Sequence, residues 1–410
     1  MKADEIISIE QRLMASVYSK KPIAAVRGKG ARIWDSEGRE YIDCMGSYGV
    51  SIIGHCHPKL VEAICRQAGE LISCHGSLYN DDRSEFLEKL SRVTPKGVDK
   101  AFLGNSGAEA VECALKLARK YTGRKEIIAM MGAFHGKTMG ALSVTWDKKY
   151  RAPFEPLIPG IKHVPFGNLE KLKEAISPET AAIIVEPIQG EGGIRPPPEG
   201  YLKGIRDLCD DGKALLILDE IQTGLGRTGK MFACEHWSVV PDIICIGKAI
   251  AGGIPMGVTV AKEEVMSAFK RGEHTSTFGG NPIACAAASA TLDIIVGEGL
   301  PERASRLGPR LMGGLLALKE KHGLIREVRG MGLMIGVEMK HDVYGVIMKS
   351  LEKGLLILDA GRNVLRFLPP LVIEEGQLDR AIAILDEAIG EDATSGETRD
   401  RVPDRAAEGL

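Results

Sequence analysis

The sequence has little excess charge of either sign and no long apolar run. It contains 53 Lys and Arg against 55 Asp and Glu, which leaves a formal net charge of -2 over 410 residues. Proteins dedicated to nucleic acid carry a basic excess, so no nucleic-acid partner is expected. The longest weakly polar run, 283–296, contains Ser289, Thr291 and Asp293 and is shorter than the ~18 residues that span a bilayer. No membrane partner is expected either.

The start of the sequence lacks the apolar segment of a secretory signal, and its nine cysteines include no Cys-x-x-Cys pair. Such cysteine usage fits a reducing compartment, so we expect a cytoplasmic protein. His55-Cys56-His57 has no second ligand pair at zinc spacing, so no metal site is expected. Glycine is in excess, with 49 residues against a usual share of ~7%, which indicates tight turns and close backbone approaches.

Strand-like apolar runs alternate with amphipathic helical stretches through the middle of the chain. The expected strands are 101–103, 126–131, 181–186, 214–219, 242–247 and 257–261. After the first of them a helix is expected, because apolar side chains recur at helical spacing at Ala110, Ala114, Leu117, Ala118 and Tyr121. Short buried strands separated by helices indicate an α/β fold whose mainly parallel sheet is covered on both faces.

The two ends of the chain do not continue this alternation. A hairpin is predicted at 31–34 and 40–43. Helices at 302–322, 343–353 and 375–389, with strands at 332–338, 355–358 and 364–367, predict a smaller α+β unit. We therefore expect a large α/β domain at 45–285, a small domain made of 1–44 and 286–390, and a disordered polar tail at 391–410.

One glycine-rich segment matches two phosphate-binding motifs as a string but not in context. Gly224-Leu-Gly-Arg-Thr-Gly229 has the Gly-x-Gly-x-x-Gly spacing, yet it begins several residues after a strand and precedes a segment too short for the usual helix. As a P-loop it has Met231 where a magnesium-binding Ser or Thr is needed. Neither a nicotinamide enzyme nor a nucleoside triphosphatase is favoured.

Three segments together indicate a chemical site. One expected strand ends in Asp219, the next is followed by Lys248, and Ser106 and Gly107 open a helix. Ligands of open α/β sheets bind at the carboxyl ends of the strands, so Asp219 and Lys248 are expected to face one crevice. A helix N-terminus binds phosphate through its free backbone N–H groups. An amine, a carboxylate and a phosphate-binding helix end together suit pyridoxal phosphate, with the lysine attached to the cofactor and the aspartate keeping its ring nitrogen protonated.

Several segments, in the same order, resemble those of the class III (ω-amino) pyridoxal-phosphate aminotransferases. They are Phe102-Leu-Gly-Asn-Ser-Gly-Ala-Glu-Ala110, Gly132-Ala-Phe-His-Gly136, Val185-Glu-Pro-Ile-Gln-Gly-Glu-Gly-Gly193, Leu218-Asp-Glu-Ile-Gln-Thr-Gly224, Gly247-Lys248 and Ser276-Thr-Phe-Gly-Gly-Asn-Pro282. The resemblance covers roughly residues 15–390. It implies a fold-type-I enzyme that works as a homodimer with shared active sites at the subunit interface.

The resemblance implies a role for each matching residue at the cofactor. Lys248 would bind it covalently and shuttle a proton, and Asp219 would contact the pyridine nitrogen. Phe134 would stack on the ring, His135 would line the cofactor site, and Gln222 would hydrogen-bond the phenolic oxygen. The phosphate would be held by Ser106, Gly107 and Ala108, helped by Thr277 of the partner subunit.

The resemblance also implies a pocket that accepts two substrate shapes. In this family an arginine in an Arg-Phe-x-Pro-Pro stretch, here Arg366, grips the α-carboxylate of glutamate or 2-oxoglutarate. A glutamate in a Gln-Gly-Glu stretch, here Glu191, pairs with that arginine when an ω-amine is bound. Tyr18 and Tyr48 are similar to residues that contact free ornithine in ornithine δ-aminotransferases. Lys137 stands where these enzymes and the aminotransferases for acylated ornithine or lysine usually have Arg, which keeps the charge but loses the planar grip on the substrate's distal carboxylate.

Segments around 17–50, 143–151 and 326–334 look like those of aminotransferases for acylated ornithine or lysine. That group includes enzymes of lysine and arginine biosynthesis whose substrate is linked to a small acidic carrier protein. We therefore expect transfer of the terminal amino group of an N-acylated ornithine or lysine to 2-oxoglutarate, giving a semialdehyde and glutamate. An ornithine δ-aminotransferase and a pyridoxal-phosphate-dependent racemase or epimerase stay open as alternatives.

Overall fold

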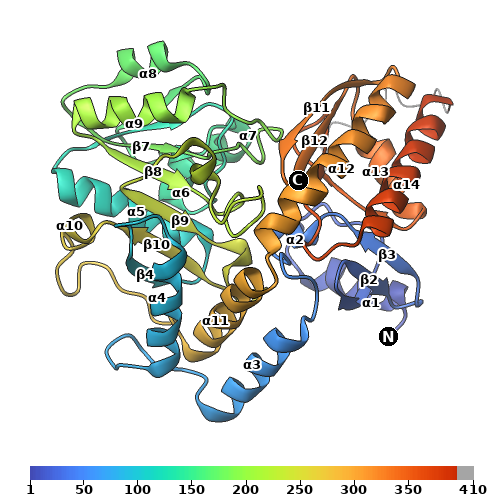
Figure 1. Cartoon of the computed structure of the whole chain (residues 1–410), viewed down its shortest axis with the longest axis horizontal. Helices are drawn as coiled ribbons and strands as arrows, with labels where there is room; N and C mark the ends of the chain where they lie inside the picture. The colour runs from blue at the N-terminus through green and yellow to red at the C-terminus, as the bar shows by residue number, and fades with distance from the viewer. Residues whose placement is uncertain (395–410) are drawn as a thin grey trace.

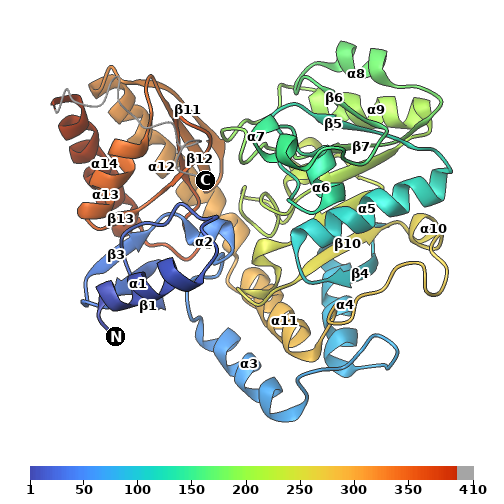
Figure 2. The ribbon, with the colours of Figure 1, turned by 180° about the vertical axis from the view of Figure 1, so that it is seen from behind.

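The computed structural model describes residues 1–394, which form two parts. In Figure 1 the larger part, coloured teal to yellow, holds a sheet between helices. The smaller part places the blue N-terminal strands beside the orange and red C-terminal elements. Two helices, α11 (Pro282–Gly297) and α12 (Leu300–Lys321), lead from the larger part to the smaller. Figure 2 shows the same arrangement from behind, where α5 (Gly107–Thr122) and α6 (Met139–Val144) lie side by side.

The large sheet of the described chain has seven strands in the order β4-β10-β9-β8-β7-β5-β6. Their bounds are β4 Lys100–Gly104, β5 Glu126–Met130, β6 Ile161–Val164, β7 Thr180–Val185, β8 Leu215–Asp219, β9 Ile243–Ile246 and β10 Gly257–Ala261. Strand β10 runs antiparallel to both of its neighbours, and the remaining pairs are parallel. The prediction of an α/β fold with a mainly parallel sheet is confirmed.

The central strands are apolar throughout because both faces of the sheet are covered. All residues of β7 are buried, and side chains along a strand alternate between the two faces. Ile183 and Val185 join the core cluster that includes α9 (Tyr201–Gly212), whereas Ala182 and Ile184 join the cluster that includes α5. This covering leaves the carboxyl ends of the parallel strands as the edge where a ligand can bind.

The smaller part is built from both ends of the described chain. Its sheets have the orders β1-β2-β3-β13 and β11-β12-β15-β14. The strands are β1 Ala25–Lys29, β2 Arg32–Asp35, β3 Glu40–Asp43, β11 Ile325–Met331, β12 Met334–Met339, β13 Leu355–Leu356, β14 Leu358–Asp359 and β15 Val364–Phe367. Parallel pairing of β13 with β3 sets Leu355 opposite Ile42, so a hydrogen-bonded ladder joins the N-terminal and C-terminal segments.

The remaining helices cover the sheets or connect them. They are α1 Ala3–Leu13, α2 Gly46–Gly49, α3 Pro58–Glu70, α4 Asp81–Val93, α7 Lys148–Arg151, α8 Leu169–Ala175, α10 Glu263–Met266, α13 Tyr344–Glu352 and α14 Glu375–Thr394, with 3-10 helices η1 Ala152–Phe154, η2 Ala233–Trp237 and η3 Lys248–Ala251. Within residues 1–394 no single helix is long and apolar enough to cross a membrane. The helices α11 and α12, bent by 61° where they meet, are together long and apolar enough for a membrane span by length and composition alone. Most of α11 is buried inside this fold, as in the core helix of a globular domain.

The structure contains three strands that the sequence pattern does not predict, β1, β6 and β11. Each of them is the edge strand of its sheet and is largely exposed or half-buried, so none shows a continuous apolar run. At the other end, α14 continues through Thr394 into the predicted tail, and the rest of that tail, 395–410, lies outside the described residues. The expected domain limits at 44/45 and 285/286 stay a prediction.

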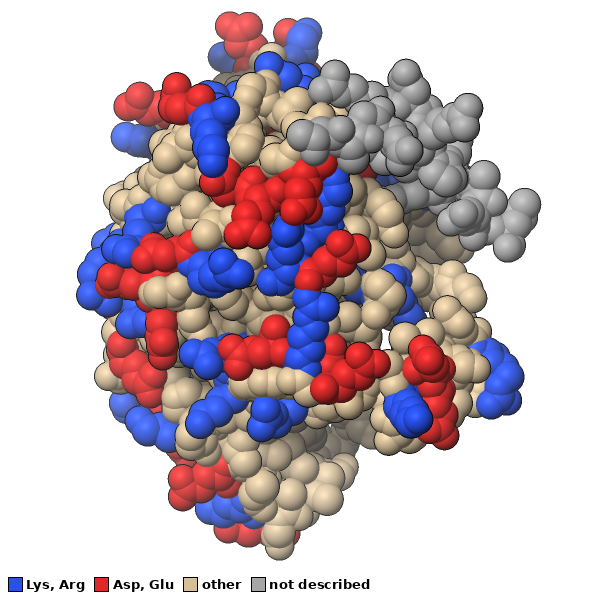
Figure 3. All heavy atoms as spheres, turned by 90° about the vertical axis from the view of Figure 1, so that its right-hand side faces the viewer, with Lys and Arg blue, Asp and Glu red and all other residues tan. Residues whose placement is uncertain are grey.

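Charged side chains of both signs are interspersed on the face of the smaller part that Figure 3 shows. Ion pairs join α12 to α14, among them Arg310 with Asp379 and Lys321 with Asp386, each at 2.6 Å. Exposed pairs of this kind contribute little to stability, because solvent screens them and the long side chains lose freedom. Their effect is to make this face polar and solvated.

Candidate active site

Asp219 and His135 form a buried pair at the carboxyl edge of the large sheet. Asp219 is the last residue of β8, and His135 follows β5, which is separated from β8 by β7. Nδ1 of His135 lies 2.7 Å from Oδ2 of Asp219, while the backbone N–H of Ile221 donates to Oδ1 at 3.1 Å. Burial lowers the pKa of His135, but the hydrogen bond and charge of Asp219 outweigh it and the pKa is raised. The imidazole therefore fixes the orientation of the carboxylate.

A second buried carboxylate, Glu186, was not selected by sequence reasoning. It follows β7 directly and accepts hydrogen bonds from the backbone N–H groups of Phe134 and Gly190, both at 2.9 Å. Burial raises its pKa to about 7. Glu186 thus ties together the loops after β5 and β7, which carry Phe134 and Glu191. Its position in the sequence could have identified it, because it directly follows a fully apolar strand. That strand, β7, is the neighbour of β8, which ends in Asp219.

Lys248 lies just beyond β9, the neighbour of β8. Its backbone φ of 45° falls in the left-handed region, which non-glycine residues adopt rarely and often at functional sites. Within residues 1–394 its ε-amine has no hydrogen-bond or ion-pair partner. Burial lowers the pKa of this amine to about 8; Arg366 adds to that effect, and Glu191 and Asp219 oppose it. Such an amine is uncharged in part near neutral pH and can act as a nucleophile.

The first turn of α5 lies close to the same edge. Ser106 caps the helix by accepting a hydrogen bond from the backbone N–H of Glu109 at 3.2 Å. Ser106 is exposed, and the first N–H groups of a helix, here those of Gly107 and Ala108, have no acceptor within the helix. A Cβ on Gly257 would lie only 1.9 Å from the carbonyl oxygen of Ser106, so glycine at that position lets β10 approach the helix start. The turn can bind an anion.

Arg366 and Glu191 form an ion pair between the two parts of the molecule. Arg366 lies on β15 with 0% exposure, and its Nη1 is 2.5 Å from Oε1 of Glu191 in the loop after β7. The same Nη1 lies 3.4 Å from Oε1 of Gln222. Burial raises the pKa of Glu191, but Arg366 and Lys248 outweigh it and the pKa is lowered. The described residues supply no partner for Nε and Nη2 of Arg366, so two buried donors are available to a ligand carboxylate.

Aromatic side chains surround this part of the site. The guanidinium of Arg366 lies 5.5 Å from the ring centroid of Tyr48, which is 49% exposed. Phe134 packs edge-on against Tyr150 with their centroids 5.6 Å apart. Nζ of Lys137 lies 4.9 Å from the ring centroid of Tyr150. Lys137 is therefore an exposed cation held on an aromatic ring near Phe134.

Tyr18 and Thr277, also singled out from the sequence, lie on the surface as well. Tyr18 follows α1 and is 65% exposed, and Thr277 is exposed in the loop before α11. Ser276, the neighbour of Thr277, accepts a hydrogen bond from the side chain of Asn105 at 3.1 Å, so this loop contacts the segment that opens α5. The contribution of Thr277 to a partner subunit stays a prediction.

The donor set fits pyridoxal phosphate. It offers an amine without a partner for covalent attachment, a buried carboxylate for the pyridinium, and an open helix start for the phosphate. Among the described residues no group of three or more His, Cys, Asp and Glu side chains is placed to hold a metal ion. A mainly parallel α/β sheet with this set at its carboxyl edge defines a pyridoxal-phosphate-dependent enzyme of fold type I.

Comparison with known proteins establishes the family. The model of class-III aminotransferases matches residues 13–389. The acetylornithine aminotransferase of Methanopyrus kandleri is 48% identical over 376 residues, 91% of this chain and 96% of that protein. Ornithine aminotransferase 1 of Staphylococcus aureus is 44% identical over 389 residues, 93% of this chain and 98% of that protein. The crystal structure of the ornithine aminotransferase from Toxoplasma gondii aligns with a TM-score of 0.93 at 35% identity, covering 96% of each chain. This chain belongs to the class III aminotransferases, and the predictions of a transaminase and of pyridoxal phosphate are confirmed.

Proposed function

We propose that this aminotransferase moves the terminal amino group of N-acetylornithine, or of a similarly acylated ornithine or lysine, to 2-oxoglutarate, giving a semialdehyde and glutamate. The observation that carries the proposal is the Arg366–Glu191 pair near the unpartnered amine of Lys248. A guanidinium binds the α-carboxylate of 2-oxoglutarate through two parallel hydrogen bonds. A glutamate on the same guanidinium suits an ω-amine donor, because it neutralises the arginine when the substrate places no carboxylate there.

Bound pyridoxal phosphate supplies the electron sink that lets a C–H bond beside the transferred nitrogen break. We assign Lys248 to covalent attachment and to proton transfer at Nζ, because an amine with a pKa of about 8 both accepts and releases a proton near neutral pH. Asp219, oriented by His135, would keep the ring nitrogen protonated. Phe134 would cover the ring, Gln222 would hydrogen-bond its phenolic oxygen, and the first turn of α5 would hold the phosphate.

Glu191 would let one pocket accept both substrates by pairing with Arg366 or moving away from it. With an ω-amine donor bound, its carboxylate stays on the guanidinium of Arg366. With 2-oxoglutarate or glutamate bound, Glu191 would leave and the substrate carboxylate would pair with the guanidinium through two donors, for which the unpartnered Nε and Nη2 are available. The buried guanidinium is then paired in both half-reactions, which avoids the about 3–5 kcal/mol that an uncompensated buried charge costs.

Free ornithine is the second candidate donor. It is favoured by the 44% identity to a protein named ornithine aminotransferase and by Tyr48 beside Arg366, one of the two tyrosines that resemble ornithine-contacting residues. N-acetylornithine is favoured by the 48% identity to a protein named acetylornithine aminotransferase. In either case we assign Lys137, an exposed cation on the ring of Tyr150, to the distal carboxylate of the donor.

We also propose that the enzyme is a homodimer whose subunits share their active sites. Support comes from large apolar side chains that are exposed on the described chain around 71–79 and at the loop of Thr277. These are Leu71, Ile72, Leu78, Tyr79 and Phe278, each at least 45% exposed. Exposed apolar patches mark interaction surfaces. Analytical ultracentrifugation of the holoenzyme should give a dimer or a larger even-numbered assembly, and a monomer at assay concentration would contradict the shared sites.

A substrate panel tests the proposed donor and acceptor. Holoenzyme is assayed for glutamate formation from 2-oxoglutarate with N-acetylornithine, ornithine, N-acetyllysine, 4-aminobutyrate and lysine linked to a small acidic carrier protein. The highest kcat/KM is expected for N-acetylornithine. A higher value for free ornithine would favour the second candidate, and a preference for the carrier-linked lysine would place the acyl group on a protein. Absence of glutamate with every donor would overturn the proposal and leave a racemase or epimerase.

Arg366→Ala tests the two-shaped pocket. The variant should lose the 2-oxoglutarate half-reaction, because its carboxylate no longer has a guanidinium to bind, while the ω-amine half-reaction is spared. The two half-reactions are followed separately by absorbance in single-turnover experiments. Equal loss of both would show that Arg366 does not discriminate between the substrates.

A further inference from the structure

The loop that carries Glu191 is a tight and strained turn. It spans 189–195, and within it the N–H groups of Gly193 and Ile194 both lie 3.2 Å from the carbonyl oxygen of Gly190. Ile194 has a φ of 48°, a conformation that a β-branched residue rarely adopts. Backbone strain of this kind persists only where the surroundings hold it in place. The turn therefore needs support from outside itself.

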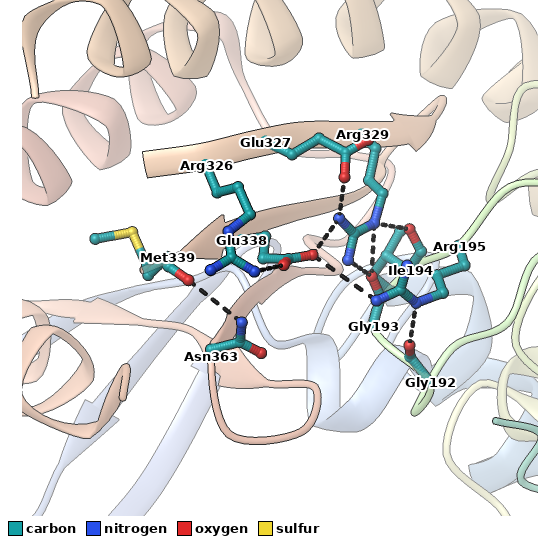
Figure 4. Close-up of polar contacts among 10 residues, drawn as sticks. All are labelled: Gly192, Gly193, Ile194, Arg195, Arg326, Glu327, Arg329, Glu338, Met339 and Asn363. Carbon is teal, nitrogen blue, oxygen red and sulfur yellow. Dashed lines mark hydrogen bonds and ion pairs between the residues drawn. The ribbon is translucent and has the colours of Figure 1, made fainter. Parts of the chain in front are cut away.

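Arg329 on β11 provides that support (Figure 4). Its Nε lies 3.0 Å from the carbonyl oxygens of both Gly193 and Ile194, and its Nη2 donates to that of Gly193 at 2.7 Å. Its Nη1 donates to Oε2 of Glu338 at 2.7 Å, and both of these side chains are only 9% exposed. Hydrogen bonds from a charged donor are stronger than neutral ones. Arg329 thus anchors the backbone of the turn directly after Glu191.

Arg329 and Arg366 reach this turn from the same row of one sheet. In the register of β11, β12 and β15, Gly336 lies opposite Arg329 on one side and opposite Arg366 on the other. Side chains directly opposite one another in antiparallel strands share a face. Glycine at position 336 lets Ile194 of the turn pack close to the sheet between the two arginines, since a Cβ there would lie 2.9 Å from Cβ of Ile194. The turn packs against this part of the sheet. Arg329 hydrogen-bonds the backbone of the turn, and Arg366 pairs with the side chain of Glu191.

We propose that Arg329 is a positioning residue that sets how firmly the carboxylate of Glu191 stays paired with Arg366. We call Arg366 masked when this pair is formed and unmasked when it is broken. The inference rests on the proposed function, in which the masked state suits the ω-amine donor and the unmasked state suits the keto acid. A ligand that binds only the unmasked state has its apparent affinity reduced by the fraction of molecules in that state. Loss of the anchor frees the turn, raises that fraction and tightens the binding of a dicarboxylate, whereas general damage to the pocket weakens it.

Glutarate, a dicarboxylate without a reactive keto group, is the probe for the unmasked state. Holoenzyme of Arg329→Gln should bind glutarate roughly 3- to 10-fold more tightly than the wild type by isothermal titration calorimetry. Its KM for the ω-amine donor should rise with little change in kcat, and the amides of 192–194 should exchange hydrogen faster. Arg326→Gln is the matched control. Arg326 lies on the same strand and donates to Glu338 at 2.9 Å, yet it is 58% exposed and its only hydrogen bond among residues 1–394 is to that carboxylate, so glutarate affinity should stay at the wild-type value.

A double-mutant cycle separates positioning from other effects. In a Glu191→Ala background the guanidinium is already unmasked, so adding Arg329→Gln should leave glutarate affinity unchanged. The inference is overturned if Arg329→Gln alone leaves glutarate binding unchanged or weaker, or if it gives the same gain in both backgrounds. Arg366→Ala tests the proposed function separately. If wild-type glutarate binding does not depend on Arg366, the two-shaped pocket fails whatever Arg329 does.

Discussion

Replacing Lys248 by methionine should stabilise the cofactor-free enzyme at neutral pH. Burial lowers the pKa of this amine from 10.5 to about 8, while the unfolded chain keeps the ordinary value. At pH 7 the folded state therefore holds the proton less favourably by about 3 kcal/mol, at about 1.36 kcal/mol per pKa unit. Methionine keeps the apolar stem without the charge. With an unfolding entropy of about 2.1 cal/mol/K per residue over 410 residues, this difference corresponds to a rise of about 4 °C in the melting temperature.

The advantage of Lys248→Met should shrink as the pH rises. Because the folded pKa lies below the unfolded pKa, the unfolded wild type binds more protons between about pH 8 and 10.5, so wild-type stability increases through that window relative to the variant. Melting of both cofactor-free proteins at pH 7 and at about pH 9.5 should show the gap narrowing by about 2 kcal/mol, or about 2 °C. A variant that melts with the wild type at pH 7, or a gap that is the same at both pH values, would refute the lowered pKa of Lys248.

Three further changes test other parts of the site. Glu191→Ala should lower the free energy of unfolding by about 3 kcal/mol, because Arg366 is left buried without its carboxylate, and saturating glutarate should restore most of this in urea denaturation; an unaltered urea midpoint would contradict the pairing. Lys137→Arg should lower the KM for N-acetylornithine roughly fivefold, because a planar guanidinium binds a carboxylate through two hydrogen bonds. An unchanged KM would show that position 137 does not bind the carboxylate of the donor. Asp219→Asn should reduce kcat at least about 100-fold in steady-state assays, because a charge that stabilises the reacting centre is lost; near-normal turnover would show that this carboxylate is dispensable.

The strands that carry the site could be predicted because the sheet buries them on both faces. Such strands read as continuous apolar runs, and the sequence places the strand of Asp219 at 214–219 where the structure has Leu215–Asp219. Strand β10 has the same limits in both, 257–261. The rule that ligands bind at the carboxyl ends of the strands then leads to the expectation that Asp219 and Lys248 face one crevice, and in the structure their strands are neighbours.

The parts that could not be predicted depend on contacts between distant segments. The edge strand β11 carries no apolar alternation, so the anchor formed by Arg329 on the loop of Glu191 is invisible in local sequence. Glu186 looks like any strand-terminal carboxylate until the fold brings the N–H groups of Phe134 and Gly190 to it. The pairing of Arg366 with Glu191 came from the family resemblance, because no local pattern relates a strand of one sheet to a loop that follows a strand of another.

Borohydride reduction of the yellow holoenzyme tests most directly whether Lys248 carries the cofactor. Reduction fixes pyridoxal phosphate to the amine that holds it, and mass spectrometry of the peptides identifies that residue. The expected result is a single modified peptide that contains Lys248, together with a Lys248→Ala variant that is colourless and inactive. Modification of a different lysine, or transamination by a colourless Lys248→Ala protein, would contradict the account.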